Sequence, residues 1–301
     1  MTHPPRATHP SDAWVQCGCG AKHWGTFGAA GLLLADGVPA HRLVLQHRAL
    51  WSHHGGTWGL PGGALLPEES AVVGAVREAV EEAGIDAANV RPHATWTLTH
   101  PDWSYTTVLA RMLSDFTPSP TDAESLDVAW VAVDGVPSLP LLPAFADAWP
   151  TLRWMLDLRP VVVIDAANVV GSRPNGWWRD RAGANERLRD ELDVLARVGF
   201  EAALLRLPGG RWWPDLVLVT EGQGRGVSST ERVQVVEAPG SGDDAVVEAV
   251  HALRDSGREA RGEVLAPRAT SDVTVVTADR ELRERVTAVG ARTIGPRALL
   301  S

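Results

Sequence analysis

The pattern of apolar and polar positions predicts a chain of alternating strands and helices. Gly31–Ala35 and Arg42–His47 are short apolar runs on either side of an Asp36-Gly37 turn, a pattern typical of paired strands. A helix is indicated from Pro67, whose neighbours Glu68, Glu69 and Ser70 suit a first turn, to Gly84, which suits a left-handed cap. Further strands are predicted at 94–98, 104–112 and 129–133, and a closing helix at 141–156.

A second fold begins near Leu158-Arg159-Pro160. Val161–Ile164 is a continuous apolar run of the kind found in buried parallel strands. Strand and helix patterns alternate after it, which favours a parallel sheet with crossover helices. The predicted strands are 202–207, 216–219, 233–236, 273–277 and 292–294, and the predicted helices are 182–198, 243–254 and one after Asp279. The sequence therefore predicts an irregular lead-in at 1–24 and two α/β domains, 25–158 and 159–301.

The helix at 67–84 separates apolar residues from acidic ones. At about 100° per residue, six apolar residues fall on one side: Val72, Val73, Val76, Ala79, Val80 and Ala83. Glu78, Glu81 and Glu82 fall on the other side, where Arg77 is the only basic residue. Carboxylates this close repel one another unless a cation lies among them, and clustered carboxylate oxygens suit Mg²⁺, which bridges to substrate phosphates. An acidic surface facing solvent is the alternative interpretation.

The stretch Gly63-x5-Glu69-x7-Arg77-Glu78-Ala79-x-Glu81-Glu82-x-Gly84-Ile85 resembles the signature box of the Nudix hydrolases at every fixed position. The resemblance implies an α/β/α sandwich and hydrolysis of a nucleoside diphosphate linked to another moiety, with Mg²⁺ or Mn²⁺. It implies that Glu78 and Glu82 are metal ligands, together with Glu81 and a backbone carbonyl of the Gly62-Gly63 turn. Glu69 and Arg77 would brace the box.

The resemblance also directs attention to residues outside the box. Such enzymes often place one more catalytic carboxylate just before a strand that contains tryptophan, here Trp130, so Glu124 is the first candidate and Asp127 the second. The resemblance implies that the loop before the box contacts substrate through Arg48, His53 and His54. The alternative is that these three side chains are surface residues without such a role.

In the second half, acidic residues follow predicted parallel strands, where chemistry collects in such sheets. Asp165 and Asp279 each follow a strand, and Asp243-Asp244 begins a helix; helix capping is the alternative for Asp243 and Asp279. The segments Ile164-Asp165-x-x-Asn168, Asp243-Asp244 and Val275–Leu282 resemble the NYN branch of the PIN-like ribonucleases, which have a Rossmann-like parallel sheet. The resemblance implies metal ligands at Asp165, Asp244 and Asp279, and substrate positioning by Asn168. Single-stranded RNA would contact Trp177, Trp178, Arg173 and Arg179.

The charge balance bears on possible partners. Residues 1–158 carry 8 basic and 16 acidic side chains, and residues 159–301 carry 20 and 21. The first half therefore lacks a basic field for long nucleic acid, whereas the arginine-rich second half permits RNA binding.

Cys17 and Cys19 are the only cysteines in the 301 residues, too few for a disulfide framework. With His23 they form half of a zinc site or, alternatively, are two reduced thiols in a tight turn. The first ten residues lack the apolar core of a signal peptide, and no apolar run approaches the roughly 20 residues that span a membrane. We expect a protein of the reducing cytoplasm.

Two functions are consistent with these patterns. The first is a Mg²⁺-dependent pyrophosphohydrolase joined to a ribonuclease or RNA-binding domain. The alternative is a nucleotide-sensing regulator in which the Nudix fold binds without turnover and the second half is an inert docking module. A complete box and an alternating βα second half favour the first.

Overall fold

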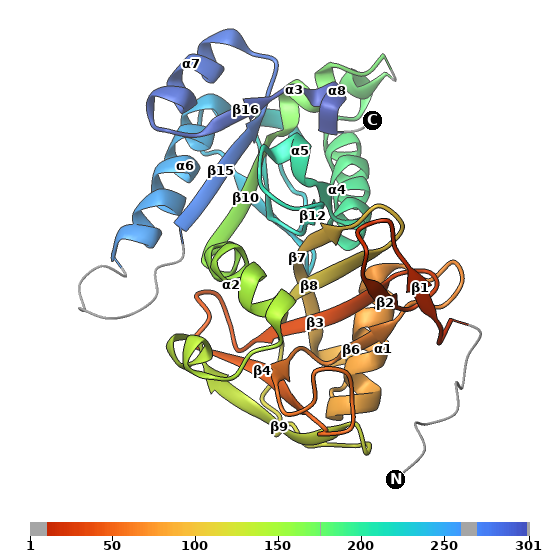
Figure 1. Cartoon of the computed structure of the whole chain (residues 1–301). Coiled ribbons are helices and arrows are strands. Elements are labelled where there is room, and N and C mark those ends of the chain that lie inside the picture. The colour runs from red at the N-terminus through yellow and green to blue at the C-terminus, as the bar shows by residue number, and fades with distance from the viewer. Residues whose placement is uncertain (1–10, 175, 260–269, 300–301) are drawn as a thin grey trace. The chain divides into compact units, whose positions relative to one another are not determined.

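The structure, a computed structural model of the whole chain, describes residues 11–174, 176–259 and 270–299. The chain divides into two compact units, Met1–Asp157 and Leu158–Ser301, whose elements are drawn in Figure 1. The first ten residues of the predicted lead-in lie outside the described residues. Across the described ranges, no helix has the length and apolarity that crossing a membrane requires.

The N-terminal unit is built on a mixed sheet in which β7, β8, β3, β4 and β5 lie in that order. Strand β3 runs parallel to β8 and antiparallel to β4 and β6, and β4 runs antiparallel to β5 and β9. The strands are β3 (Ala29–Ala35), β4 (Arg42–Arg48), β5 (Trp58–Gly59), β6 (Gly62–Ala64), β7 (Val90–Thr99), β8 (Ser104–Met112) and β9 (Ser125–Ala132). The turn expected at Gly62-Gly63 is thus part of a short strand paired with β3.

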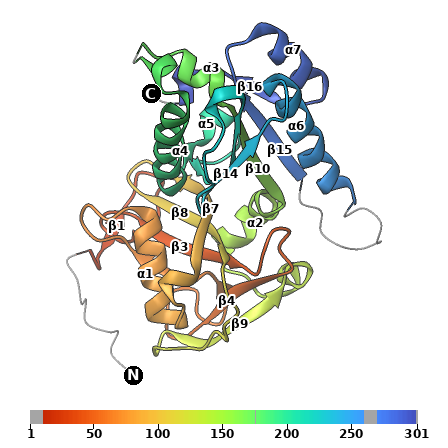
Figure 2. The ribbon, with the colours of Figure 1, turned by 180° about the vertical axis from the view of Figure 1, so that it is seen from behind.

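Helices α1 (Ala71–Ala83) and α2 (Pro143–Leu156) cover opposite faces of this sheet (Figures 1 and 2). Because neighbouring strand residues point to opposite faces, β3 has to be apolar throughout, and all seven of its residues are buried. Short 3₁₀ turns at Ala87–Asn89 and Val133–Ser138 complete the unit. The predicted strands and closing helix of the first half are confirmed.

Helix α1 differs from its prediction in its start and in its buried face. Ser70 is the N-cap, and its side chain accepts a bond from the Val73 amide. The buried face is centred on Ala75, Ala79 and Ala83, whereas Val73 and Val80 are 59% and 40% exposed. Small residues at this spacing let the helix approach β3 and β8 closely.

The predicted irregular lead-in contains a two-stranded hairpin. Strands β1 (Trp14–Gln16) and β2 (Lys22–Trp24) pair antiparallel around the Cys17–Ala21 turn. With only three residues in each strand, the apolar pattern was too short to indicate them.

The C-terminal unit is built on a five-stranded sheet of order β14-β13-β10-β15-β16, in which all strands are parallel. The strands are β10 (Leu158–Asp165), β13 (Asp215–Thr220), β14 (Val233–Glu237), β15 (Thr270–Val276) and β16 (Arg292–Ile294). The helices and 3₁₀ turns are α3 (Ala166–Gly171), η3 (Trp177–Arg179), α4 (Arg181–Val198), α5 (Ala202–Leu205), η4 (Gly222–Gly224), α6 (Gly242–Glu259), α7 (Arg280–Ala288) and α8 (Pro296–Leu299). The predicted alternation of strand and helix is confirmed.

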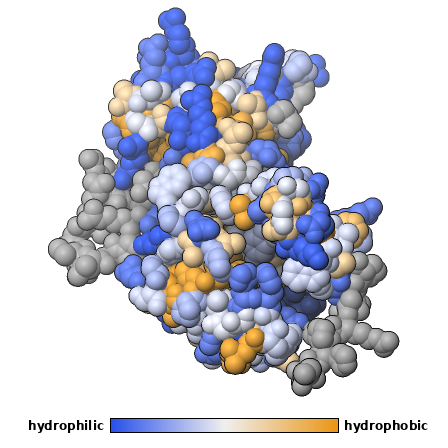
Figure 3. All heavy atoms as spheres, in the orientation of Figure 1, coloured by the Kyte–Doolittle hydropathy of each residue, from blue (hydrophilic) through white to orange (hydrophobic). Residues whose placement is uncertain are grey.

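Helices cover both faces of the parallel sheet, with α6 and α7 on one side and α4 on the other (Figures 1 and 2). Val246, Val250 and Leu282 pack on Val161 and Val275, so each helix buries its apolar stripe against the central strands. Each such side chain contributes about 1.5–3 kcal/mol of hydrophobic stabilisation. The outer surface over α7 is hydrophilic (Figure 3), as expected from its charged residues.

One strand prediction was wrong. Residues 202–207 include the short helix α5, preceded by a two-residue strand β11 (Phe200–Glu201) that pairs with β12 (Arg211–Trp212). Alanine and leucine favour helical backbone, and Arg206 closes the turn in the left-handed region at φ 53°. The Leu207 amide donates to the Ala202 carbonyl.

Candidate active site

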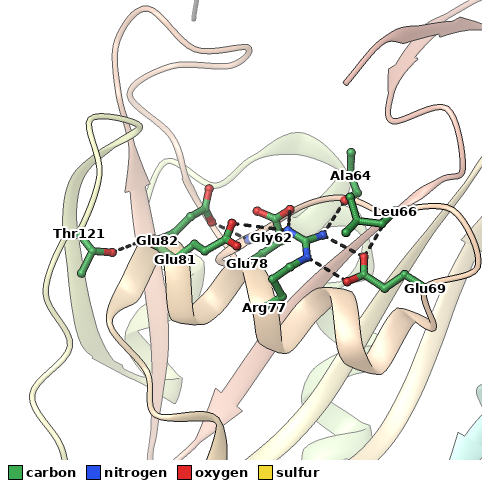
Figure 4. Close-up of polar contacts among 9 residues, drawn as sticks. All are labelled: Gly62, Ala64, Leu66, Glu69, Arg77, Glu78, Glu81, Glu82 and Thr121. Carbon is green, nitrogen blue, oxygen red and sulfur yellow. Dashed lines mark hydrogen bonds and ion pairs between the residues drawn. The ribbon is translucent and has the colours of Figure 1, made fainter. Parts of the chain in front are cut away.

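Glu82 lies on the inner side of α1 and is only 5% exposed. Its Oε2 accepts a 2.7 Å hydrogen bond from the Gly62 amide on β6 (Figure 4). Burial raises the pKa of Glu82 to about 8, and the charges of Glu78, Asp122 and Glu124 act in the same direction. The predicted acidic face is therefore turned into the protein at this residue, and a carboxylate here requires a nearby cation to remain ionised.

Arg77 links the other box carboxylates. Its Nε and Nη2 contact the two oxygens of Glu69, each at 2.9 Å, and its Nη1 contacts Glu78 Oε1 at 2.7 Å (Figure 4). A further bond runs from Nη2 to the Ala64 carbonyl at 3.0 Å. The bonds to Glu69 raise the pKa of Arg77, so its charge is permanent. Glu81 lies at the rim, with 59% of its side chain exposed and its Oε2 3.5 Å from Arg77 Nη1.

Glu78 is held between Arg77 and β6. Burial raises the pKa of its carboxyl, while the hydrogen bond and charge of Arg77 oppose this rise. A side chain at Gly63 would place its Cβ 2.6 Å from Glu78 Oε1, so only glycine leaves room for this carboxylate. At Gly62 a Cβ would collide with the backbone of β3. The metal contact predicted for a carbonyl of this segment stays a prediction, since the contact observed is the amide of Gly62 with Glu82.

Two further carboxylates come from the loop before β9. Oxygen atoms of Glu82, Asp122 and Glu124 all lie within 4.8 Å of one another. The Asp122 side chain accepts the Glu124 amide at 3.0 Å, which fixes the loop, and burial raises the pKa of Glu124. Asp127, the second candidate, lies within β9, is exposed and accepts the amide of Val128.

Sequence reasoning missed Asp122. It lies in an irregular loop 40 residues from Glu82, and no local pattern distinguishes it from the other surface aspartates. Its position two residues before Glu124 was the one available signal.

A cation faces this acidic group from β4. The charge of Arg48 opposes the rise that burial causes in the pKa of Glu124, and the Arg48 Nε donates to the His53 carbonyl at 3.2 Å. Burial raises the pKa of Tyr105, and the charges of Glu82 and Arg48 act on it in opposite directions. His53 packs on Trp14 and His54, with ring centroids 5.3 and 4.1 Å away.

The donor set fits a hard divalent cation. Oxygen ligands converge, burial raises the pKa of one of them, Glu82, and the charges of Arg48 and Arg77 act on neighbouring carboxylates. Such a site can hold a metal together with a polyphosphate.

The C-terminal unit brings a second acidic group to the carboxyl edge of its sheet. Asp165 ends β10, caps α3 through a 3.1 Å bond from the Asn168 amide, and accepts Thr277 Oγ1 at 3.0 Å. Asn168 Oδ1 accepts the Ala278 amide at 2.7 Å, so it ties the two strand ends together. Asp279 is the N-cap of α7, because its side chain accepts the Leu282 amide, as the alternative interpretation expected.

The charges of Asp243 and Glu221 act on Asp165 at this edge, and the metal contact predicted for Asp244 stays a prediction. Burial raises the pKa of Asp165, and the charges of Asp243 and Glu221 contribute. Glu221, which follows β13, accepts the Gly242 amide at 2.6 Å, and sequence reasoning missed it. Asp244 instead accepts Arg285 Nη2 at 2.5 Å, because the first turn of α6 points it towards α7.

The aromatic residues predicted to contact RNA lie on η3. Trp178 is 58% exposed, and the Arg181 guanidinium lies 5.3 Å from the ring centre of Trp177. Arg173 makes two bonds to Glu191, so its charge is already neutralised.

Comparisons with known proteins agree with this geometry. The family model described as NUDIX domain matches residues 26–155. A Mycobacterium tuberculosis protein named "Putative 8-oxo-dGTP diphosphatase 3" is 47% identical over 156 residues, which cover 47% of this chain and 69% of that protein.

Two further relatives match the same part of the chain. A Bifidobacterium longum "Nucleoside triphosphate pyrophosphatase/Nudix hydrolase fusion protein" is 45% identical over 154 residues, covering 49% of this chain but only 32% of that protein's length. The crystal structure of the Nudix hydrolase RenU from M. smegmatis is 42% identical, with 48% of this chain and 93% of that chain covered and a TM-score of 0.44. Through residues 26–155, the chain belongs to the Nudix family.

Proposed function

We propose that the N-terminal unit hydrolyses a pyrophosphate bond in a nucleoside triphosphate or another nucleoside diphosphate derivative, with Mg²⁺ or Mn²⁺. The observation that carries the proposal is the convergence of Glu82, Asp122 and Glu124, on which the charges of Glu78 and Arg48 act. The names of its relatives concern nucleoside triphosphates and 8-oxo-dGTP, which supports substrates of this class.

Each residue then has a defined task. Bound divalent ions would supply neutralising charge for the diphosphate and a more acidic water. Glu78, Glu82 and Glu124 would hold the ions, and Arg77, anchored by Glu69, would keep Glu78 ionised and oriented. Arg48 attracts the negative charge of the polyphosphate to the open side of the carboxylates.

A substrate panel tests the proposal. The intact protein is incubated with Mg²⁺ or Mn²⁺ and canonical or oxidised nucleoside triphosphates, ADP-ribose, dinucleoside polyphosphates or capped RNA, and phosphate and pyrophosphate release are measured separately. We expect turnover of at least one nucleotide, and a loss of at least about 100-fold in Glu82→Gln, the scale of losing a principal charge stabiliser. Saturable nucleotide binding without turnover on the whole panel would favour the sensing regulator.

We propose a second activity for the C-terminal unit: metal-dependent cleavage of single-stranded RNA. Its support is the parallel sheet with Asp165, Glu221, Asp243 and Asp279 at the carboxyl edge, where Asp243 takes the place first assigned to Asp244. Trp177 and Trp178 offer stacking surfaces. Cleavage of a labelled RNA with Mn²⁺ that is lost in Asp165→Asn but kept in Glu82→Gln would support this activity. Unchanged products in Asp165→Asn would leave the unit as a docking module.

A further inference from the structure

The β1–β2 hairpin brings two thiols and an imidazole together outside the Nudix site. Cys17 Sγ, Cys19 Sγ and a ring nitrogen of His23 all lie within 4.8 Å of one another, and Cys19 Sγ is 3.2 Å from His23 Nε2. Zinc bonds of about 2.3 Å to sulfur and 2.0 Å to nitrogen place tetrahedral ligand atoms roughly 3.5 Å apart. The three atoms therefore need little movement to share one ion.

The backbone holds this arrangement in place. The Cys17 amide donates to the Ala21 carbonyl at 3.0 Å, and the Gly20 amide donates to the Cys17 carbonyl at 3.0 Å. Gly20 adopts φ 88°, which a residue with a side chain adopts only under strain. The tight turn thereby directs both thiols towards the His23 side of β2.

The β7–β8 turn supports the same group. Asp102 Oδ2 accepts the Gly18 amide at 2.7 Å, and the Trp103 ring stacks on His23 at 4.4 Å with 10° between the planes. The imidazole is thus held at a fixed angle, as in metal sites with an ordered second layer of contacts.

We propose that Cys17, Cys19 and His23 bind one Zn²⁺ ion, with a water on the exposed side of Cys19 as the fourth ligand. Two thiolates and an imidazole are borderline-soft ligands that select zinc over the hard Mg²⁺ of the carboxylate site. The ion stabilises the hairpin, whose Trp14 packs edge-on against His53 at 5.3 Å. The His53 carbonyl in turn accepts a hydrogen bond from Arg48 Nε.

Metal analysis of the full-length protein tests this proposal. Protein purified without chelator is dialysed and its zinc content measured. Zinc is then replaced by Co²⁺, and the thiolate-to-cobalt charge-transfer absorption is recorded. We expect one zinc per chain. In competition with a chromogenic chelator, Cys19→Ser and His23→Gln should bind zinc at least about tenfold more weakly, because even the loss of a residue that only supports a metal ligand costs this much affinity.

Two controls separate this site from the carboxylate site. Glu82→Gln, which damages the Nudix carboxylates, and His41→Gln, which changes an exposed histidine elsewhere, should both retain zinc and the charge-transfer band. Zinc should also protect the exposed Cys19 thiol from a thiol-reactive dye until a chelator is added. The proposal fails if wild-type protein binds zinc no better than Cys19→Ser, or if zinc leaves the reactivity of Cys19 unchanged, in which case the residues are two reduced thiols in a turn.

Discussion

The guanidinium of Arg77 and the carboxylate of Glu69 form a two-point ion pair, with Nε to Oε1 and Nη2 to Oε2 both 2.9 Å. The remaining nitrogen of Arg77 contacts Glu78 at 2.7 Å. One side chain therefore connects the start of the box to a proposed metal ligand. Glu69 also accepts the Leu66 amide at 2.9 Å, so the loop before α1 is fixed by the same group.

Arg77→Lys should lower nucleotide turnover by about 10- to 100-fold, because an ammonium cannot contact two carboxylates through a planar fork. Steady-state kinetics with Mg²⁺ measure the effect, with circular dichroism as the check on folding. The matched control is Arg42→Lys, at an arginine paired with Asp36 outside the box. Equal losses in both variants would contradict a specific role for Arg77.

Gly63→Ala should remove most of the activity while the protein stays folded. The added Cβ would lie 2.6 Å from Glu78 Oε1, so the carboxylate has to move away from its place beside Arg77. Gly135→Ala is the control, because there the nearest atom to an added Cβ is 4.0 Å away. Full activity in Gly63→Ala would show that the position of Glu78 is not critical.

The stability of the metal-free protein should depend on the ionisation of Glu82. Its pKa is raised from 4.5 to about 8 in the folded state, so between these values the folded protein holds a proton that the unfolded chain has lost. The contribution of the protonated Glu82 carboxyl to the free energy of unfolding is fully present below about pH 4.5 and is lost as the pH rises through about 8. Because other groups titrate too, the quantity to compare is the free energy of unfolding of wild type minus that of Glu82→Gln.

Thermal and urea unfolding in EDTA at several pH values test this prediction. Relative to Glu82→Gln, wild type should lose stability as the pH rises from 5 to 9, and excess Mg²⁺ should oppose the loss because the metal requires the ionised carboxylate. A difference that is flat with pH would mean that Glu82 is not buried in the folded metal-free state.

The sequence predicted those parts of the molecule that depend on local spacing. Glu78 and Glu82 are four residues apart, so any helix places them on one side. The β-branched apolar run at Val161–Ile164 favours a strand buried on both faces, as observed in β10. The same local rules misplaced Val73 and Val80, because which side of α1 is buried depends on the small residues that fit against β3.

Other site residues could not be predicted because long-range contacts decide them. Asp122 joins Glu82 only when the loop before β9 folds back on α1, where the Thr121 amide donates to the Glu82 carbonyl. Asp243 and Asp244 are neighbours in sequence, and only the fold shows that Asp244 is the one that pairs with Arg285, 41 residues beyond it.

Asp122→Asn should raise the Mg²⁺ concentration needed for half-maximal nucleotide turnover by about tenfold or more. Its oxygen lies within 4.8 Å of those of Glu82 and Glu124, and it also orders the loop through the Glu124 amide. Asp127→Asn removes the same charge from the exposed part of β9 and should leave the metal dependence unchanged. If the two variants behave alike, the effect is one of net charge and not of the site.

The proposed RNA-cleaving edge makes a prediction about two adjacent residues. Asp243 interacts electrostatically with Asp165 and Asp279, whereas Asp244 is paired with Arg285. Asp243→Asn should therefore abolish Mn²⁺-dependent cleavage of single-stranded RNA, while Asp244→Asn keeps the activity and loses stability through the broken pair with Arg285. Product formation on gels and thermal unfolding, measured on the same preparations, distinguish the two effects. Cleavage that disappears in Asp244→Asn but persists in Asp243→Asn would return the metal-binding role to Asp244 and require the first turn of α6 to rotate when the ion binds.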